Sequence, residues 1–88
     1  MELRRIARDR IAKGELPGVL RPLRTWGGHG SGQPCDLCGR TIRTDEMGYE
    51  VEYAGNSAQA LRFHVICESI WTLEVVRADY LLAHAADS

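Results

Sequence analysis

Cys35-Asp36-Leu37-Cys38-Gly39 and His64-Val65-Ile66-Cys67 are the two stretches that decide the fold of this chain. Together they have the two-plus-two spacing with which Cys and His side chains close a tetrahedral zinc site. They hold all three cysteines of the sequence, so a disulfide between two of them would leave the third unpaired. The pattern predicts one structural zinc ion in a reducing compartment, and its predicted ligands are Cys35, Cys38, His64 and Cys67.

The short length of the chain favours such an ion. Its 88 residues form one domain, and a chain of this size buries only about 60–65% of its unfolded surface, so the apolar core alone is marginal. In isolated zinc-finger peptides the apparent binding free energy is roughly 10–16 kcal/mol, and much of it appears as folding free energy. We therefore expect the metal to supply stability that the core lacks.

A β-hairpin is predicted between the two ligand pairs. Residues 47–53 alternate between apolar and polar side chains, as a half-buried strand does. Gly55-Asn56-Ser57 marks a turn, and Leu61-Arg62-Phe63 is the expected returning strand. In the first ligand pair, Gly39 can adopt the positive φ that a sharp turn requires.

A helix over residues 64–83 is predicted after the hairpin. It contains no Gly or Pro, and its apolar residues recur at helical spacing: Ile66, Ile70, Leu73, Val76 and Tyr80. This assignment places His64 and Cys67 in the first helical turn, where residues i and i+3 share a face. The partial positive charge at a helix N-terminus also favours a Cys67 thiolate. We expect Trp71 to pack beside the metal.

The order of these parts resembles the treble-clef zinc finger, in which a Cys-x-x-Cys turn and a hairpin precede a helix that carries the second ligand pair. The resemblance covers residues 35–83, and the chain looks like small bacterial zinc-finger proteins. It implies an α+β fold with a structural zinc ion. Treble clefs bind DNA, RNA or other proteins, and a few take part in catalysis, so the resemblance does not choose the function.

The first third of the chain lies outside this resemblance. Residues 2–13 have helical apolar spacing and a glycine stop at Gly14. The following segment, with Pro17 and Pro22, reads as an extended connector in which Trp26 occupies a groove, followed by a glycine-rich loop. We divide the chain into a basic N-terminal helix (1–15), a connector with its loop (16–34), a zinc domain (35–84) and a tail (85–88).

The charge is strongly asymmetric, although its sum is −1. Residues 1–43 carry a net charge of +5 and residues 44–88 carry −6. The basic helix therefore either meets the acidic half of its own chain or contacts a polyanion. The candidate polyanion-binding residues are Arg4, Arg5, Arg8, Arg10 and Lys13. The overall pI, near 6.3, is low for a dedicated nucleic-acid binder.

Two functions follow as hypotheses. The first is a non-enzymatic, zinc-binding module that acts through protein–protein interaction. The second is a nucleic-acid-binding transcriptional regulator that uses the basic helix. The end of the long helix carries surplus apolar surface, which predicts a protein partner or a homodimer through that helix; its residues are Val75, Val76, Tyr80, Leu81 and Leu82.

Other interpretations of the same residues are weaker. Cys35 and Cys38 could form a redox pair, but no βαβ unit surrounds them. Cys67 with His64 could be a catalytic thiol and base, but no third group orients them. A site with four protein ligands has no open position for water, which argues against an enzyme. His29 and His84 are expected to be ordinary surface residues.

The absence of a long apolar run or a signal peptide predicts a cytoplasmic protein without membrane contact. The glycines of residues 27–32 lack the strand and the Gly-Lys-Ser/Thr sequence of a phosphate-binding loop. Asp36 and Asp45 are expected to serve in turns rather than as metal ligands.

Overall fold

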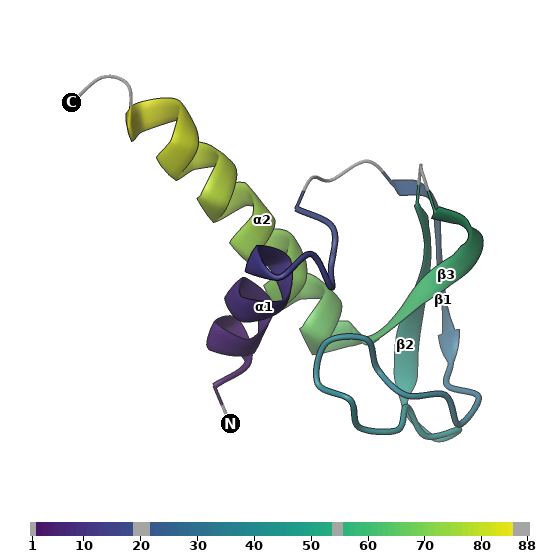
Figure 1. Cartoon of the computed structure of the whole chain (residues 1–88). Coiled ribbons are helices and arrows are strands. Elements are labelled where there is room, and N and C mark those ends of the chain that lie inside the picture. The colour runs from purple at the N-terminus through teal and green to yellow at the C-terminus, as the bar shows by residue number, and fades with distance from the viewer. Residues whose placement is uncertain (1, 19–21, 54–55, 86–88) are drawn as a thin grey trace.

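Two helices and an antiparallel sheet make up the computed structural model, which describes residues 2–18, 22–53 and 56–85 (Figure 1). The elements in chain order are α1 (Leu3–Ala12), β1 (Pro22–His29), β2 (Met47–Tyr53), β3 (Asn56–His64) and α2 (Val65–Ala85). The strands are ordered β1-β2-β3. The expected α+β class is confirmed.

The core lies where α2 crosses the sheet, and Trp71 is its centre. Its side chain is 1% exposed, stacks on the Phe63 ring at a centroid distance of 5.1 Å, and meets Tyr53 at 5.9 Å. The indole N–H, which needs an acceptor when buried, donates to the Pro17 carbonyl at 3.0 Å. Trp71 thus joins the sheet, the long helix and the segment that follows α1.

The segment 16–34, expected to be a connector and loop, contains a third strand. Residues of β1 pair with β2 in an antiparallel register, for example Trp26 with Glu50 and Gly28 with Gly48. The Trp26 ring is 43% exposed rather than enclosed, and the Arg24 guanidinium lies 5.8 Å from the ring centroid. The strand was missed because glycines and prolines hide its alternation.

The helix α2 is apolar on two sides, and spacing alone does not show which side is buried. The residues that face the core are Cys67, Trp71, Glu74 and Val75. Most of the residues whose spacing predicted the helix instead face solvent, with Ile66 61% and Leu73 51% exposed. Within the described residues, neither helix combines the length and the apolarity needed to cross a bilayer.

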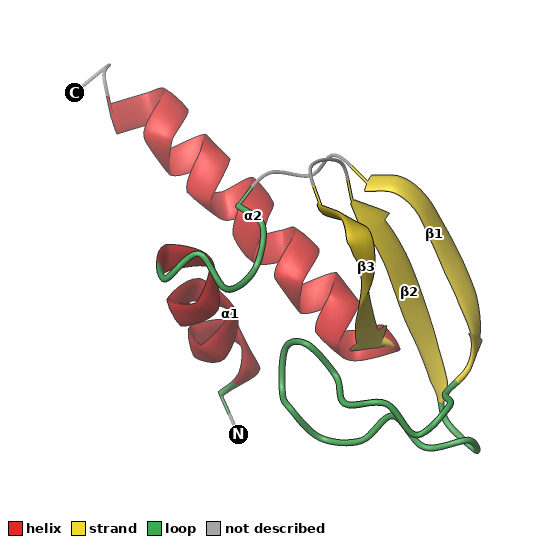
Figure 2. Cartoon of the chain, turned by 45° about the vertical axis from the view of Figure 1, so that its right-hand side comes forward, coloured by secondary structure: helices red, strands yellow, loops and turns green. Residues whose placement is uncertain are grey.

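The helix α1 packs against α2 and not on the sheet. The face of the sheet that points away from α2 is covered by neither helix (Figure 2). Ala7 of α1 is fully buried, and Leu16, which follows the helix, is 3% exposed; both belong to the core. Gly14 has a φ of +76°, which confirms the predicted glycine stop. A ten-residue helix is marginal in water, so this contact is what stabilises α1.

Close backbone packing at Gly30 yields a first prediction. A methyl group on Gly30 would meet the carbonyls of Ile42 and Arg43 and approach the Ile42 side chain to 2.6 Å. We expect Gly30→Ala to lower the free energy of unfolding by about 1–3 kcal/mol. Urea unfolding at fixed free zinc measures it. Gly28→Ala is the matched control, since nothing lies within 4 Å of its added carbon; equal losses in both variants would contradict the packing.

Candidate metal centre

The first ligand pair lies on a turn that is anchored to β3. The Gly39 N–H donates to the Cys35 carbonyl at 2.9 Å, and Gly39 takes the expected positive φ, +77°. Asp36 makes two bonds to one residue: its N–H donates to the Arg62 carbonyl at 2.7 Å, and its carboxylate accepts the Arg62 N–H at 2.7 Å. Asp36 therefore holds the turn in place rather than binding the metal.

The second ligand pair lies at the junction between β3 and α2. His64 is the last residue of β3 and still pairs with Gly48, whereas α2 begins at Val65. The expectation that both ligands belong to the first helical turn is therefore wrong for His64. His64 is positioned by its pairing in the sheet, whereas Cys67 is positioned by the helix.

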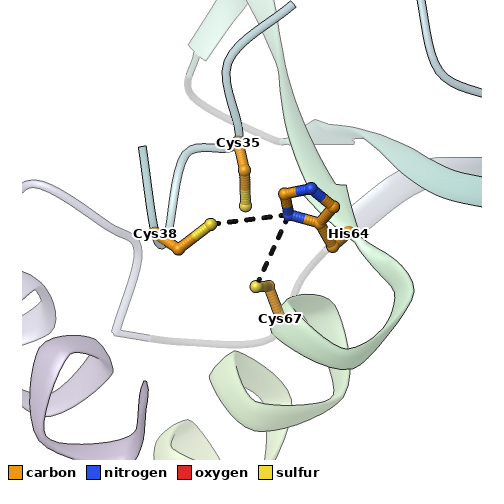
Figure 3. Close-up of side chains that lie close together, drawn as sticks. All are labelled: Cys35, Cys38, His64 and Cys67. Atoms are coloured by element: carbon orange, nitrogen blue, oxygen red, sulfur yellow. Dashed lines mark hydrogen bonds between the residues drawn. The ribbon is translucent and has the colours of Figure 1, made fainter. Parts of the chain in front are cut away.

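The four side chains converge on one point (Figure 3). Their ligand atoms, one from each of Cys35, Cys38, His64 and Cys67, all lie within 4.8 Å of one another. The His64 Nδ1 atom is 3.5 Å from the Cys38 Sγ atom and 3.8 Å from the Cys67 Sγ atom. Tetrahedral zinc with its usual bond lengths separates nitrogen and sulfur ligands by about 3.6 Å. The cluster can hold a metal ion, and its geometry is compatible with zinc.

The second ring nitrogen of His64, Nε2, fixes the orientation of the imidazole. The His64 Nε2 atom lies 3.2 Å from the Thr41 carbonyl oxygen, which can only accept a hydrogen bond. It therefore carries the proton, and Nδ1 is left with its lone pair toward the sulfurs. The Glu46 carboxylate lies 3.8 Å from Nε2, too far for a hydrogen bond, and adds negative charge beside the ring. Backbone carbonyls and carboxylates hold metal-binding histidines in this way.

The environment of the cysteines suits thiolates that share a cation. Burial opposes ionisation of Cys35, but the backbone N–H groups of Cys38, His64 and Leu37 outweigh it and lower the pKa of Cys35. Burial raises the pKa of Cys67, and the neighbouring sulfurs of Cys35 and Cys38 raise it further. A bound cation would offset the repulsion among three thiolates in so small a volume.

The remaining sequence candidates lie elsewhere. Within the described ranges, the four-residue cluster is the single group of three or more His, Cys, Asp and Glu side chains arranged to hold a metal, so His29 belongs to none. The side chain of His84 lies outside the described part of the chain. Thr41, whose carbonyl orients His64, was not foreseen, because a backbone acceptor leaves no signature in the sequence.

Two arginines of the basic helix are engaged by a buried acid. The Arg4 Nε atom donates to one oxygen of Glu74 at 2.8 Å, and the Arg8 Nε atom donates to the other at 2.7 Å. Glu74 is only 1% exposed. Burial alone would raise the pKa of Glu74, but the hydrogen bonds from Arg8 and Arg4 outweigh burial and lower it. Glu74 was missed, although an acid one turn after Trp71 is a visible signal.

The other candidate cations lie on α1 or directly after it and do not contact Glu74. Lys13 pairs with Asp9 at 2.9 Å, and Arg10 pairs with Glu15 at 3.3 Å. Arg5 is exposed. The five candidate residues therefore do not converge on one site, because Arg4 and Arg8 are directed at Glu74 on α2.

The chain was compared with protein-family models, curated proteins and solved structures. None of these three comparisons gives a match. The function is therefore inferred from the arrangement of the cluster and of the surfaces around it.

Proposed function

We propose that this chain is a non-enzymatic, treble-clef-type zinc module that acts by binding another protein. A tight Cys-x-x-Cys turn, a hairpin and a helix surround one four-ligand cluster, in the order that a treble clef requires. Bound zinc would supply structural cross-linking and no reactive position, since Cys35, Cys38, His64 and Cys67 complete its tetrahedron. Cys35 and Cys67 are each 2% exposed, whereas Cys38 and His64 are half-buried and line a groove beside the cluster.

The observation that carries the proposal is the exposed apolar surface of α2. Ile66 is 61% exposed, Leu73 51%, Val76 52% and Tyr80 60%, and their spacings of seven, three and four residues place them on one side of the helix. Soluble monomers rarely leave contiguous apolar patches uncovered, and such patches usually mark interaction sites. The zinc cluster fixes the start of α2, so the helix is presented as a rigid element.

The alternative, a nucleic-acid-binding regulator, receives less support from the basic helix. A phosphate group would have to compete with Glu74 for Arg4 and Arg8, and this carboxylate is buried against them. The two arginines therefore serve first as the attachment of α1 to α2.

A titration of random duplex DNA separates these functions. We expect the zinc-loaded chain to leave the fluorescence anisotropy of labelled DNA unchanged at both low and moderate salt. Binding that weakens steeply with salt, and that is lost in Arg5→Glu/Lys13→Glu, would contradict the proposal. These two positions are chosen because neither touches Glu74, so the fold is retained. A known nucleic-acid-binding protein measured in the same buffers is the positive control.

A further inference from the structure

One stripe of α2 repeats with a period of seven residues and faces solvent along its whole length. It is called the α2 seam here, and it consists of Ile66, Ser69, Leu73, Val76, Tyr80 and Ala83, all of them exposed. Their spacing alternates between three and four residues, as the two apolar positions of a coiled-coil heptad do. Trp71 and Val75, which lie between them in sequence, are buried. The seam is therefore a second apolar face, distinct from the one that packs on the sheet.

The seam continues beyond the rest of the domain. In Figure 1 the C-terminal half of α2 extends past both α1 and the sheet. At 3.6 residues per turn, the centre of the seam lies about 130° around the helix from Glu74 and about 170° from Trp71. Near its start the seam is bordered by Leu3 of α1 and Met47 of β2, which line a groove with Ile66 and Ser69.

We propose that the α2 seam binds the same seam of a second copy of this chain, with the two helices antiparallel. This inference rests on the proposed function and names its partner. In an antiparallel pair, each position of one heptad type faces a position of the other type. The resulting layers join Ile66 to Ala83, Ser69 to Tyr80 and Leu73 to Val76 of the second copy, and each layer occurs twice by symmetry.

The sizes of the side chains favour this orientation. Each of the outer layers combines a large residue with a small one, and Leu73 with Val76 fills the centre. A parallel pair would instead place Tyr80 against Tyr80, and Ser69 and Ala83 each against itself. Such layers would be overfilled in one place and empty in two others, and both faults are destabilising.

A groove beside the N-terminal end of the seam can accept the Tyr80 side chain of the layer that joins Ser69 to Tyr80. Its volume is about 770 Å³, and Leu3, Met47, Ile66 and Ser69 contribute to its lining, together with Cys38, His64 and Cys67 of the metal cluster. In the antiparallel register the Tyr80 ring of the second copy enters this groove over Ser69. The Ser69 hydroxyl already donates to the Val65 carbonyl at 3.2 Å, so covering it leaves no unpaired donor.

The charges around the seam also fit an antiparallel pair. The seam itself contains no ionisable carboxylate, amine or guanidinium. Arg40 lines the groove at the N-terminal end of α2 and would meet the C-terminal end of the second helix, where the backbone carbonyls carry partial negative charge. A parallel pair would bring the two Arg40 side chains together instead. Asp79 would lie beside Thr72 of the second copy, so like charges do not oppose each other there.

Light scattering coupled to size-exclusion chromatography tests the dimer. We expect the full zinc-loaded chain to elute as a dimer at micromolar concentration. Leu73→Glu is expected to weaken dimerisation at least about a hundredfold, since two carboxylates would be buried without partners. Leu82→Glu is the matched control: it changes the same residue type on the same helix, at a site 75% exposed and outside the seam, and the dimer should persist.

Mixing two variants tests the orientation. Ser69→Lys in one chain and Tyr80→Glu in the other should each abolish the homodimer, because a charge is buried. Mixed together, they should form a heterodimer, since the antiparallel register pairs the new lysine with the new glutamate. A parallel register would leave both charges unpaired, and mixing would not restore assembly.

The outcomes separate this inference from the proposed function. A folded, zinc-loaded monomer would overturn the dimer and leave the module free to bind a different protein. A dimer that survives Leu73→Glu, or variants that fail to combine, would overturn the seam or its orientation. A chain that contains no metal would overturn the proposed function itself.

Discussion

Replacing Cys67 with serine is expected to leave the chain unfolded at neutral pH. The serine hydroxyl is not a usual zinc ligand, so the variant keeps three of four ligands and loses most of the metal affinity. Apparent zinc-binding free energies of roughly 10–16 kcal/mol in small fingers are as large as the whole stability of a typical domain, about 5–15 kcal/mol. Far-ultraviolet circular dichroism and the zinc content of the purified, reduced protein measure the two losses together.

His64→Cys is the control for this experiment. It exchanges the imidazole for a thiolate and retains four ligands of kinds that structural zinc accepts. We expect this variant to bind one zinc ion and to remain folded, with some loss of stability because the bond to the Thr41 carbonyl disappears. If Cys67→Ser were folded, and if a chelator left the circular dichroism of the wild-type chain unchanged, the structural role of the metal would be wrong.

Removing Arg4 and Arg8 is expected to cost up to about 3–5 kcal/mol of unfolding free energy, since the buried Glu74 carboxylate loses both of its hydrogen-bonded partners and keeps the longer ion pair with Arg77, at 3.7 Å. The variant is Arg4→Ala/Arg8→Ala, measured by urea unfolding at fixed free zinc. The side chains of Arg4 and Arg8 are 49% and 47% exposed, whereas the Glu74 side chain has no exposed surface. The expected loss of stability therefore arises mainly from the buried carboxylate of Glu74 and not from lost packing of the two arginines.

The pH dependence of this loss follows from the direction of the shift. In the wild type, Glu74 has a lowered pKa, so its contribution is present above the unfolded value and disappears as the pH falls through the folded one. Without the arginines, burial raises the pKa of Glu74, and protonation then stabilises the folded state. The deficit of the variant should shrink as the pH is lowered from neutrality.

Two controls support the assignment. Arg5→Ala, on the same helix but exposed, should change the stability by less than about 0.5 kcal/mol. Arg4→Met/Arg8→Met/Glu74→Met should recover most of the loss, because apolar side chains can replace a buried ionic cluster at little cost. An equal effect of Arg5→Ala and of the double substitution would show that Glu74 is not the reason.

The metal cluster was the most predictable part of this protein, because its signal is local. A tight turn and two short spacings identify Cys35, Cys38, His64 and Cys67 without any knowledge of the fold, and the structure brings all four together. The strand Met47–Tyr53 was predictable for the same reason, since its alternation lies within one continuous segment. Their identity as treble-clef parts, and zinc as the metal, stay predictions.

Features that depend on distant partners were not predictable. Nothing within Pro22–His29 marks it as a strand; its pairing with Met47–Tyr53 does so. The charge asymmetry left open whether the basic helix meets the acidic half of its own chain. Only the position of Glu74 in the fold shows that Arg4 and Arg8 bind an acid of the same chain. The buried side of α2 was ambiguous because the helix is apolar on both sides.

The pairing of Arg4 with Glu74 has a consequence for synthesis of the chain. The two residues are 70 positions apart in the sequence. Trp71 and Pro17, whose carbonyl accepts the indole N–H, are 54 positions apart. The first helix therefore leaves the ribosome long before the surface that stabilises it exists. It must wait, exposed to proteases and chaperones, until translation has passed the last ligand and the start of the long helix is set.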